Sequence, residues 1–135
     1  KCSVWTETGG VYGHPLPYKL STLPADGGVK ASIRIDVAQA DYYKAKFTHP
    51  NSFSSSPTLN DAVAWTGSTI VGQVSVAAMS AYEAAKVTYN NVTEYNLTLA
   101  GSTWFTVSST AQYGSTKSLP AGNYTAIIKA ECIAK

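Results

Sequence analysis

Two cysteines near the ends of the chain, Cys2 and Cys132, are the residues whose type and position most directly suggest chemistry. A pair of cysteines can form a disulfide, ligate a metal or supply a reactive thiol, and each use needs different neighbours. Nothing close to either residue in the sequence would activate a thiol or complete a zinc site. The pair therefore predicts a Cys2–Cys132 disulfide, with two unrelated buried thiols as the alternative.

Such a disulfide would close a loop of nearly the whole chain, which contributes on the order of 4 kcal/mol in the chain-entropy model. It also indicates an oxidising compartment, because disulfides persist there and are rare in the cytosol. The sequence begins Lys-Cys-Ser without an initiating Met, which is typical of a mature form whose signal peptide has been removed. We expect an extracellular or cell-surface protein.

The other residues capable of chemistry do not form a catalytic pattern. His14 and His49 each precede a proline in a loop-like stretch, so we expect both to be exposed and neither to ligate a metal. The eight carboxylates are isolated from one another in sequence, and no nucleophile elbow or phosphate-binding glycine loop occurs. We predict that the protein is not an enzyme and that it uses no catalytic residue, metal or cofactor.

Composition restricts the classes of partner. Only 13% of the residues are charged, the net charge is +2, and the lysines are scattered without a basic run. A nucleic-acid partner would need such a run, so we expect none. No apolar stretch approaches the length of a membrane span.

Hydrophobic residues make up 44% of the 135 residues and are spread evenly along the chain, which predicts one domain over residues 1–135.

Nine tyrosines and three tryptophans suggest a carbohydrate-binding surface, but most of them lie inside strand-like patterns, where aromatic rings fill cores. We expect the following to be core residues: Trp65, Tyr89, Tyr95, Trp104 and Tyr124. The better surface candidates are Tyr12, Tyr18, Tyr42 and Tyr113.

Three Asn-x-Ser/Thr sequons occur, at Asn91, Asn96 and Asn123. The alternative to glycosylation is that they are chance matches in a chain rich in Ser, Thr and Asn.

These side chains must be positioned by strands, and the last stretch of the chain shows this best. Pro120 and Gly122 predict a turn. After it the residues alternate to the end of the chain, which predicts a terminal strand with one uncharged face and one wetter face. The uncharged face carries Tyr124, Ala126, Ile128, Ala130 and Cys132. Residues 1–8 alternate more loosely, with Cys2, Val4 and Thr6 opposite Ser3, Trp5 and Glu7.

Alternation predicts further strands between these two ends. The best runs over residues 29–39, with Val29, Ala31, Ile33, Ile35 and Val37 facing inward. Others are expected at residues 41–47, 62–66, 69–76, 87–99 and 103–107, with a turn at Gly67-Ser68. Residues 77–86 would form a short helix or a small-residue edge strand. Short strands separated by turns, with almost no helix, predict an all-β antiparallel sandwich of Greek-key type.

Three segments resemble the pilins of the alpha class of chaperone–usher fimbriae. They are VAWTG at residues 63–67, AYEAA at 81–85, and PAGNYT at 120–125, which leads into the terminal strand. The resemblance implies an incomplete immunoglobulin-like fold, in which a groove is filled by the N-terminal strand of a neighbouring subunit.

We therefore hypothesise a structural subunit of an extracellular filament or pilus, assembled with other copies of itself by strand donation. Residues 1–8 would be the donor strand, through Cys2, Val4, Trp5 and Thr6. The groove would be bordered by Tyr124, Ala126, Ile128 and Ala130. A donated strand would make the Cys2–Cys132 disulfide intermolecular, whereas pairing within one chain would make it internal. The alternative function is a self-contained adhesin domain that binds glycans or another surface.

Overall fold

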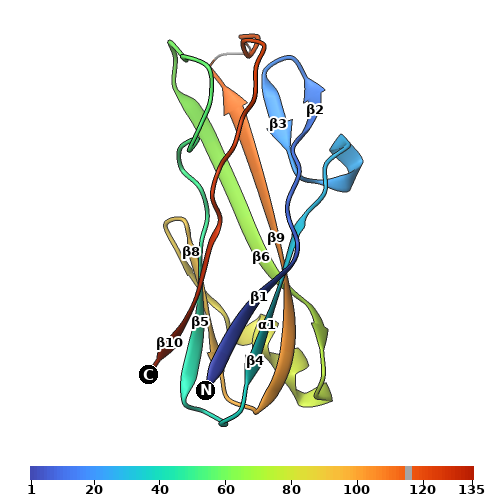
Figure 1. Ribbon diagram of the computed structural model, residues 1–135, viewed down its shortest axis with the longest axis vertical. Helices are drawn as coiled ribbons and strands as arrows, with labels where there is room; N and C mark the ends of the chain where they lie inside the picture. Colours follow the sequence, from blue (N-terminus) through green and yellow to red (C-terminus); the bar gives the residue numbers. More distant parts are fainter. Residues whose placement is uncertain (115–116) are drawn as a thin grey trace.

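The computed structural model describes residues 1–114 and 117–135, which form an all-β antiparallel sandwich of two sheets (Figure 1). The strands are β1 (Cys2–Thr8), β2 (Gly13–Leu16), β3 (Lys19–Ser21), β4 (Ala31–Val37), β5 (Tyr43–Thr48), β6 (Val63–Val74), β7 (Val87–Tyr89), β8 (Val92–Leu97), β9 (Gly101–Tyr113) and β10 (Lys129–Ala134). The short helical segments are η1 (Pro24–Asp26), η2 (Ala77–Ala81) and α1 (Tyr82–Ala85). The predicted fold class is confirmed, while its immunoglobulin-like identity stays a prediction.

The long strand β9 organises the first sheet. One edge of β9 pairs with β4 along its first half and with β3 along its second half, and its other edge pairs with β6. β1 then pairs with β4, and β2 pairs with β3. The second sheet has the order β10-β5-β8-β7. The first and last strands, β1 and β10, are thus edge strands of different sheets, and both chain ends lie at one end of the sandwich (Figure 1).

Three aromatic rings form the centre of the core between the sheets. Phe47, Tyr95 and Phe105 are almost completely buried. The ring centroid of Phe105 lies 4.8 Å from that of Phe47 and 4.7 Å from that of Tyr95. These tilted contacts are the geometry that aromatic pairs favour. Because Phe105 comes from the first sheet and the other two rings from the second, this cluster holds the layers together.

The strand predicted best from sequence has the expected faces but is shorter at both ends. Ala31, Ile33, Ile35 and Val37 are buried in β4, which confirms their inward prediction. Val29 was expected to join them, but it is 44% exposed and makes only an isolated bridge to Val11. That part of the prediction is wrong because the chain leaves the sheet through η1 and the glycines that follow it, before β4 begins.

The turn predicted at Gly67-Ser68 does not exist, since β6 runs through it as one strand from Val63 to Val74. A glycine is needed at position 67 because any side chain there would clash with His49. A Cβ at this position would lie 2.6 Å from the side chain of His49, so the glycine marks a close approach and not a chain reversal.

Within residues 77–86, for which the sequence predicted either a short helix or an edge strand, the chain forms the helical segments η2 and α1. It packs through Met79 and Tyr82, which are both buried. None of the helices in the described residues has the length and apolar character needed to cross a membrane.

Candidate functional site

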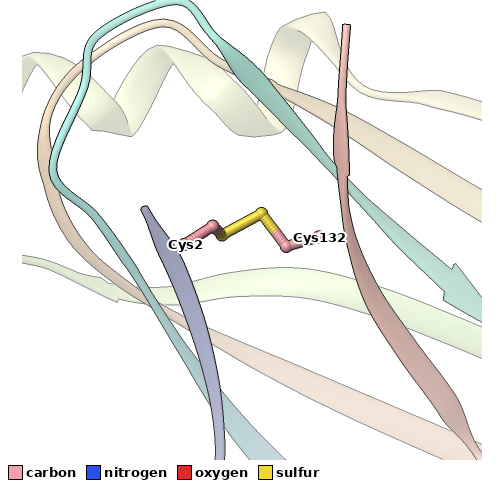
Figure 2. The surroundings of a disulfide bond; sticks show 2 residues. All are labelled: Cys2 and Cys132. Atoms are coloured by element: carbon pink, nitrogen blue, oxygen red, sulfur yellow. A yellow bond between two sulfur atoms is a disulfide. The ribbon is translucent and has the colours of Figure 1, made fainter.

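The disulfide predicted from sequence is confirmed and lies within one chain. Cys2 and Cys132 are bonded, with their Cα atoms 6.4 Å apart. Figure 2 shows the bridge reaching from β1 across to β10. It therefore connects the edge strand of one sheet to the edge strand of the other, on the side of the sandwich where neither strand has a further neighbour.

β1 leaves one row of backbone groups unpaired. The amide of Ala38 donates to the carbonyl oxygen of Lys1 over 3.1 Å, which shows that Lys1 points its backbone groups toward the β4 side. In an antiparallel pair these groups alternate in direction along the strand. Val4 and Thr6 therefore point their backbone N–H and C=O away from β4, and within residues 1–114 and 117–135 no further strand lies beside β1 on that side.

The C-terminal segment, residues 119–135, has a matching free edge. The amide of Lys135 donates to the carbonyl oxygen of Tyr42 over 2.9 Å, and pairing of β10 with β5 continues back to Lys129. By the same alternation, Ala130 and Cys132 point their backbone groups away from β5. Among the described residues, no backbone hydrogen bond joins Ala126, Ile127 or Ile128 to another element.

The terminal strand was predicted to begin at Tyr124, but β10 begins only at Lys129. Before it, Thr125 forms an isolated bridge with Ser55. The pairing stops because β5 ends at Thr48 and is followed by Pro50, which has no N–H to offer. The predicted faces are nevertheless present, since Ala126 and Ile128 are half-buried while Ile127 is 68% exposed.

Between the two free edges lies a first hollow of about 190 Å³, and we call this hollow together with the one that adjoins it the edge groove. Thr6 and Thr8 line the first hollow from the β1 side, and Ala126 and Ile128 line it from the C-terminal side. A second hollow of about 450 Å³ adjoins the first at Tyr12 and continues between His14 and Pro120. The edge groove thus runs along the gap between the first and last segments of the chain, which descend side by side in Figure 1.

The edge groove is uncharged. Its floor includes Ala31 and Ile33, and the residues that line the first hollow carry no ionised side chain. The Tyr12 hydroxyl lies 2.8 Å from the Ser109 hydroxyl, and burial raises the pKa of Tyr12, so this group stays neutral. A groove with apolar walls and free backbone donors and acceptors suits an extended, uncharged peptide segment.

The opposite side of the sandwich is closed by side chains that cap the free edge of β6. The Val71 amide donates to Glu83 Oε1 over 2.8 Å, and Lys86 Nζ donates to the Thr69 carbonyl oxygen over 2.8 Å. The Tyr95 hydroxyl donates to the same oxygen over 3.0 Å. Burial opposes ionisation of Glu83, but hydrogen bonds from Lys86 and Val71 outweigh it and lower the pKa of this carboxyl. These contacts cap the outer edge of β6 at Thr69 and Val71.

The residues predicted as donor and acceptor are brought to the same place. Cys2, Val4, Trp5 and Thr6 lie in β1, which pairs with β4 of its own chain. Tyr124, Ala126 and Ile128 line the hollows, and Ala130 packs against the core beside them. Sequence reasoning placed Ala31 and Ile33 on an inward strand face and Tyr12 at the surface, but it missed that they line one groove, because period-two patterns identify faces of strands and not gaps between edge strands.

The three sequons differ in accessibility. The side-chain amide of Asn91 donates to the His49 carbonyl oxygen over 2.8 Å, and the residue is half-buried. Asn96 and Asn123 are exposed. A glycan would therefore meet less obstruction at Asn96 and Asn123 than at Asn91.

The aromatic assignments were partly wrong. Tyr113 was expected at the surface but is 5% exposed, because it is the last inward-facing residue of β9. Tyr89 was expected in the core but is 43% exposed, on the short edge strand β7. Trp104 lies between buried Thr103 and Phe105, so alternation turns its side chain to the outer face of the sheet.

His49 was predicted to be exposed, and this is wrong because the ring packs against Gly67 and is 5% exposed. Its Nε2 lies 3.3 Å from the Thr93 hydroxyl and 3.4 Å from the Thr69 hydroxyl. Burial, together with the nearby charge of Lys86, lowers the pKa of His49. The folded protein therefore favours the neutral ring.

We expect acid to destabilise the protein through His49. Its pKa lies below the value of about 6.5 for a histidine in the unfolded chain, so the unfolded state binds the proton first. The free energy of unfolding should fall as the pH drops below about 6.5, by at most about 1.4 kcal/mol per pH unit. Urea denaturation between pH 7.5 and 5 measures this slope. A His49→Gln variant should flatten it, whereas His14→Gln, at an exposed site, should not.

Among the described residues, no three His, Cys, Asp or Glu side chains lie close enough together to hold a metal ion. Comparison with known proteins finds no family model and no curated protein that matches the chain.

Proposed function

We propose that this protein is a structural subunit of an extracellular filament, and that the edge groove receives an extended strand from a neighbouring copy. The observation that carries the proposal is the pair of free strand edges, on β1 and on the C-terminal segment, that face one uncharged hollow. A strand placed there would gain backbone hydrogen bonds, each worth about 0.5–1.5 kcal/mol net.

A second copy is the occupant that the chemistry favours. The residues that line the first hollow offer no charge that would select a charged peptide or a nucleic acid. A strand donated from one copy into the groove of the next would be a head-to-tail contact, which extends into a filament when its rotation does not close a ring. The resemblance of residues 63–135 to alpha-class chaperone–usher pilins implies the same mode of assembly. The internal disulfide is compatible with the extracellular location that a filament needs.

That residues 1–8 are the donor strand stays a prediction. In the single chain they are held by β4 and by the disulfide to Cys132. Their donation would require β1 to leave β4 and the cysteine to bond with a neighbour instead. A subunit with the internal disulfide is accordingly an acceptor, and its donor would be another extended segment of the neighbouring copy.

Filling the groove should abolish assembly without unfolding the subunit. In Ala126→Trp the new ring occupies the first hollow, so a donated strand is excluded. We expect the assembled fraction to fall roughly tenfold or more, with the melting temperature of the monomer within about 3 °C of the wild type. Sedimentation and electron microscopy of native material measure assembly.

The matched control is Ile127→Trp, which adds the same ring to the neighbouring residue on the exposed outer face. It should assemble as the wild type does. If Ala126→Trp assembles normally while its monomer is folded, the groove is not the site of subunit contact and the proposal is wrong.

One observation favours the second candidate function, a surface-binding adhesin domain. Trp5, Arg34 and Trp104 lie directly opposite one another on three adjacent strands, and Trp5 is 51% exposed. The Arg34 guanidinium lies 5.5 Å from the centroid of the Trp5 ring. Aromatic rings beside a planar hydrogen-bond donor are a common binding surface for glycans. Native material that is monomeric and binds glycans through this face would support the adhesin over the filament.

A further inference from the structure

We infer that the Cys2–Cys132 disulfide is the end stop of the edge groove, and that it sets the length and register of the strand that enters. This inference rests on the proposed function. It assigns the disulfide a role in selecting the partner strand, in addition to its role in stabilising the fold.

The bridge leaves no room for a third strand at its own level. Neighbouring strands in a sheet lie about 4.8 Å apart, so a strand inserted between two others needs them about 9.6 Å apart. The Cα atoms of Cys2 and Cys132 are 6.4 Å apart. A donated strand therefore cannot pass between the two edges where the disulfide joins them.

The groove opens at equal distances from the bridge on both edges. Thr6, four residues after Cys2, and Ile128, four residues before Cys132, line the first hollow. His14 and Pro120, each twelve residues from its cysteine, line the far end of the second hollow. The two edges run in opposite directions, so these pairs of residues mark corresponding levels along the groove.

These levels define the strand that fits. Eight residues separate Thr6 from His14, which is at most about 26 Å because β1 is irregular after Thr6 and ends at Thr8. An occupant of at most about eight residues fits this length. A sheet whose register slips by one residue turns every side chain to the wrong face, so a fixed end also fixes which side chains enter the hollows.

Hydrogen–deuterium exchange of native monomer and native assembled material, resolved to single amides, tests the stop. The amides of Ile128 and Ala134 both point away from β5, by the alternation that begins at Lys135, but they lie on opposite sides of Cys132. In assembled wild type we expect exchange at Ile128 to slow about tenfold or more and exchange at Ala134 to stay within about twofold. In assembled Cys2→Ser/Cys132→Ser, exchange at both amides should slow, because the strand can enter further.

The outcomes separate this inference from the function on which it rests. Unchanged exchange at Ile128 in assembled wild type would overturn the proposed function and the stop together. Slowed exchange at both Ile128 and Ala134 in the wild type would overturn only the stop. If the double variant assembles with Ile128 protected and Ala134 unprotected, something other than the disulfide ends the groove. Should the double variant fail to assemble, the wild-type comparison decides alone.

Discussion

Replacing both cysteines, in Cys2→Ser/Cys132→Ser, should lower the free energy of unfolding by about 4–5 kcal/mol. The bonded residues are 130 positions apart, so the disulfide restricts nearly the whole unfolded chain. In the chain-entropy model a loop of this length gives close to the largest effect that one disulfide can have. Urea denaturation of the oxidised wild type and the variant measures the difference. The dependence on urea should also steepen, because the unfolded chain without the bridge exposes more surface.

Two controls isolate the bridge from the side chains. Wild-type protein unfolded in reductant should lose the same free energy as the double variant, since both lack the same bond. Ser3→Ala, at a half-buried site on the same strand, should change the free energy by less than about 0.5 kcal/mol. A loss of less than about 1 kcal/mol in the double variant would mean that β1 and β10 are held together without the disulfide.

The strand faces could be predicted from the sequence because alternation follows directly from strand geometry. In β4, charged Arg34 and Asp36 separate buried Ile33, Ile35 and Val37, and no other element is needed to assign the faces. The same reasoning placed Cys132 on an inward face and made its pairing with Cys2 the natural prediction. The groove itself could be anticipated only through the resemblance, because it lies between strands from opposite ends of the chain.

The errors came from residues whose role depends on a distant partner. Gly67 reads as a turn residue until the ring of His49 is seen to occupy the space of its missing side chain. His49 in turn reads as a loop residue, because its burial depends on Gly67, Thr69 and Thr93. Trp104 is different, since strict alternation beside buried Phe105 already turned it outward, and the general preference of aromatic rings for cores was given too much weight.

Part of one sandwich edge is capped by side chains, whereas the groove edge is not. Natural sheets protect their free edges, and here Glu83, Lys86 and Tyr95 cap β6 at Thr69 and Val71. The groove edge has the disulfide at one end and unpaired backbone at Ala126 and Ile128 beyond it. The proposed strand donation would pair these open groups with a strand from a neighbouring copy.

The second large effect is expected in the core, where Phe105→Ala should lower the free energy of unfolding of the monomer by about 4 kcal/mol. The ring is fully buried between Phe47 and Tyr95, and its removal leaves a cavity and breaks both aromatic contacts that join the sheets in this cluster. Urea denaturation of the monomer measures the loss. Thr106→Ala, on the outward face of the same strand, should cost less than about 1 kcal/mol.

This prediction also separates the core from the groove. Phe105 and its neighbours pack within one chain, so its replacement should weaken the subunit whether or not a donor strand is present. Ala126→Trp should leave the free energy of unfolding of the monomer nearly unchanged, because the new ring enters an empty hollow. If Ala126→Trp destabilises the monomer by as much as Phe105→Ala does, the hollow is part of a closed core, and a strand from a neighbouring copy has no place to enter.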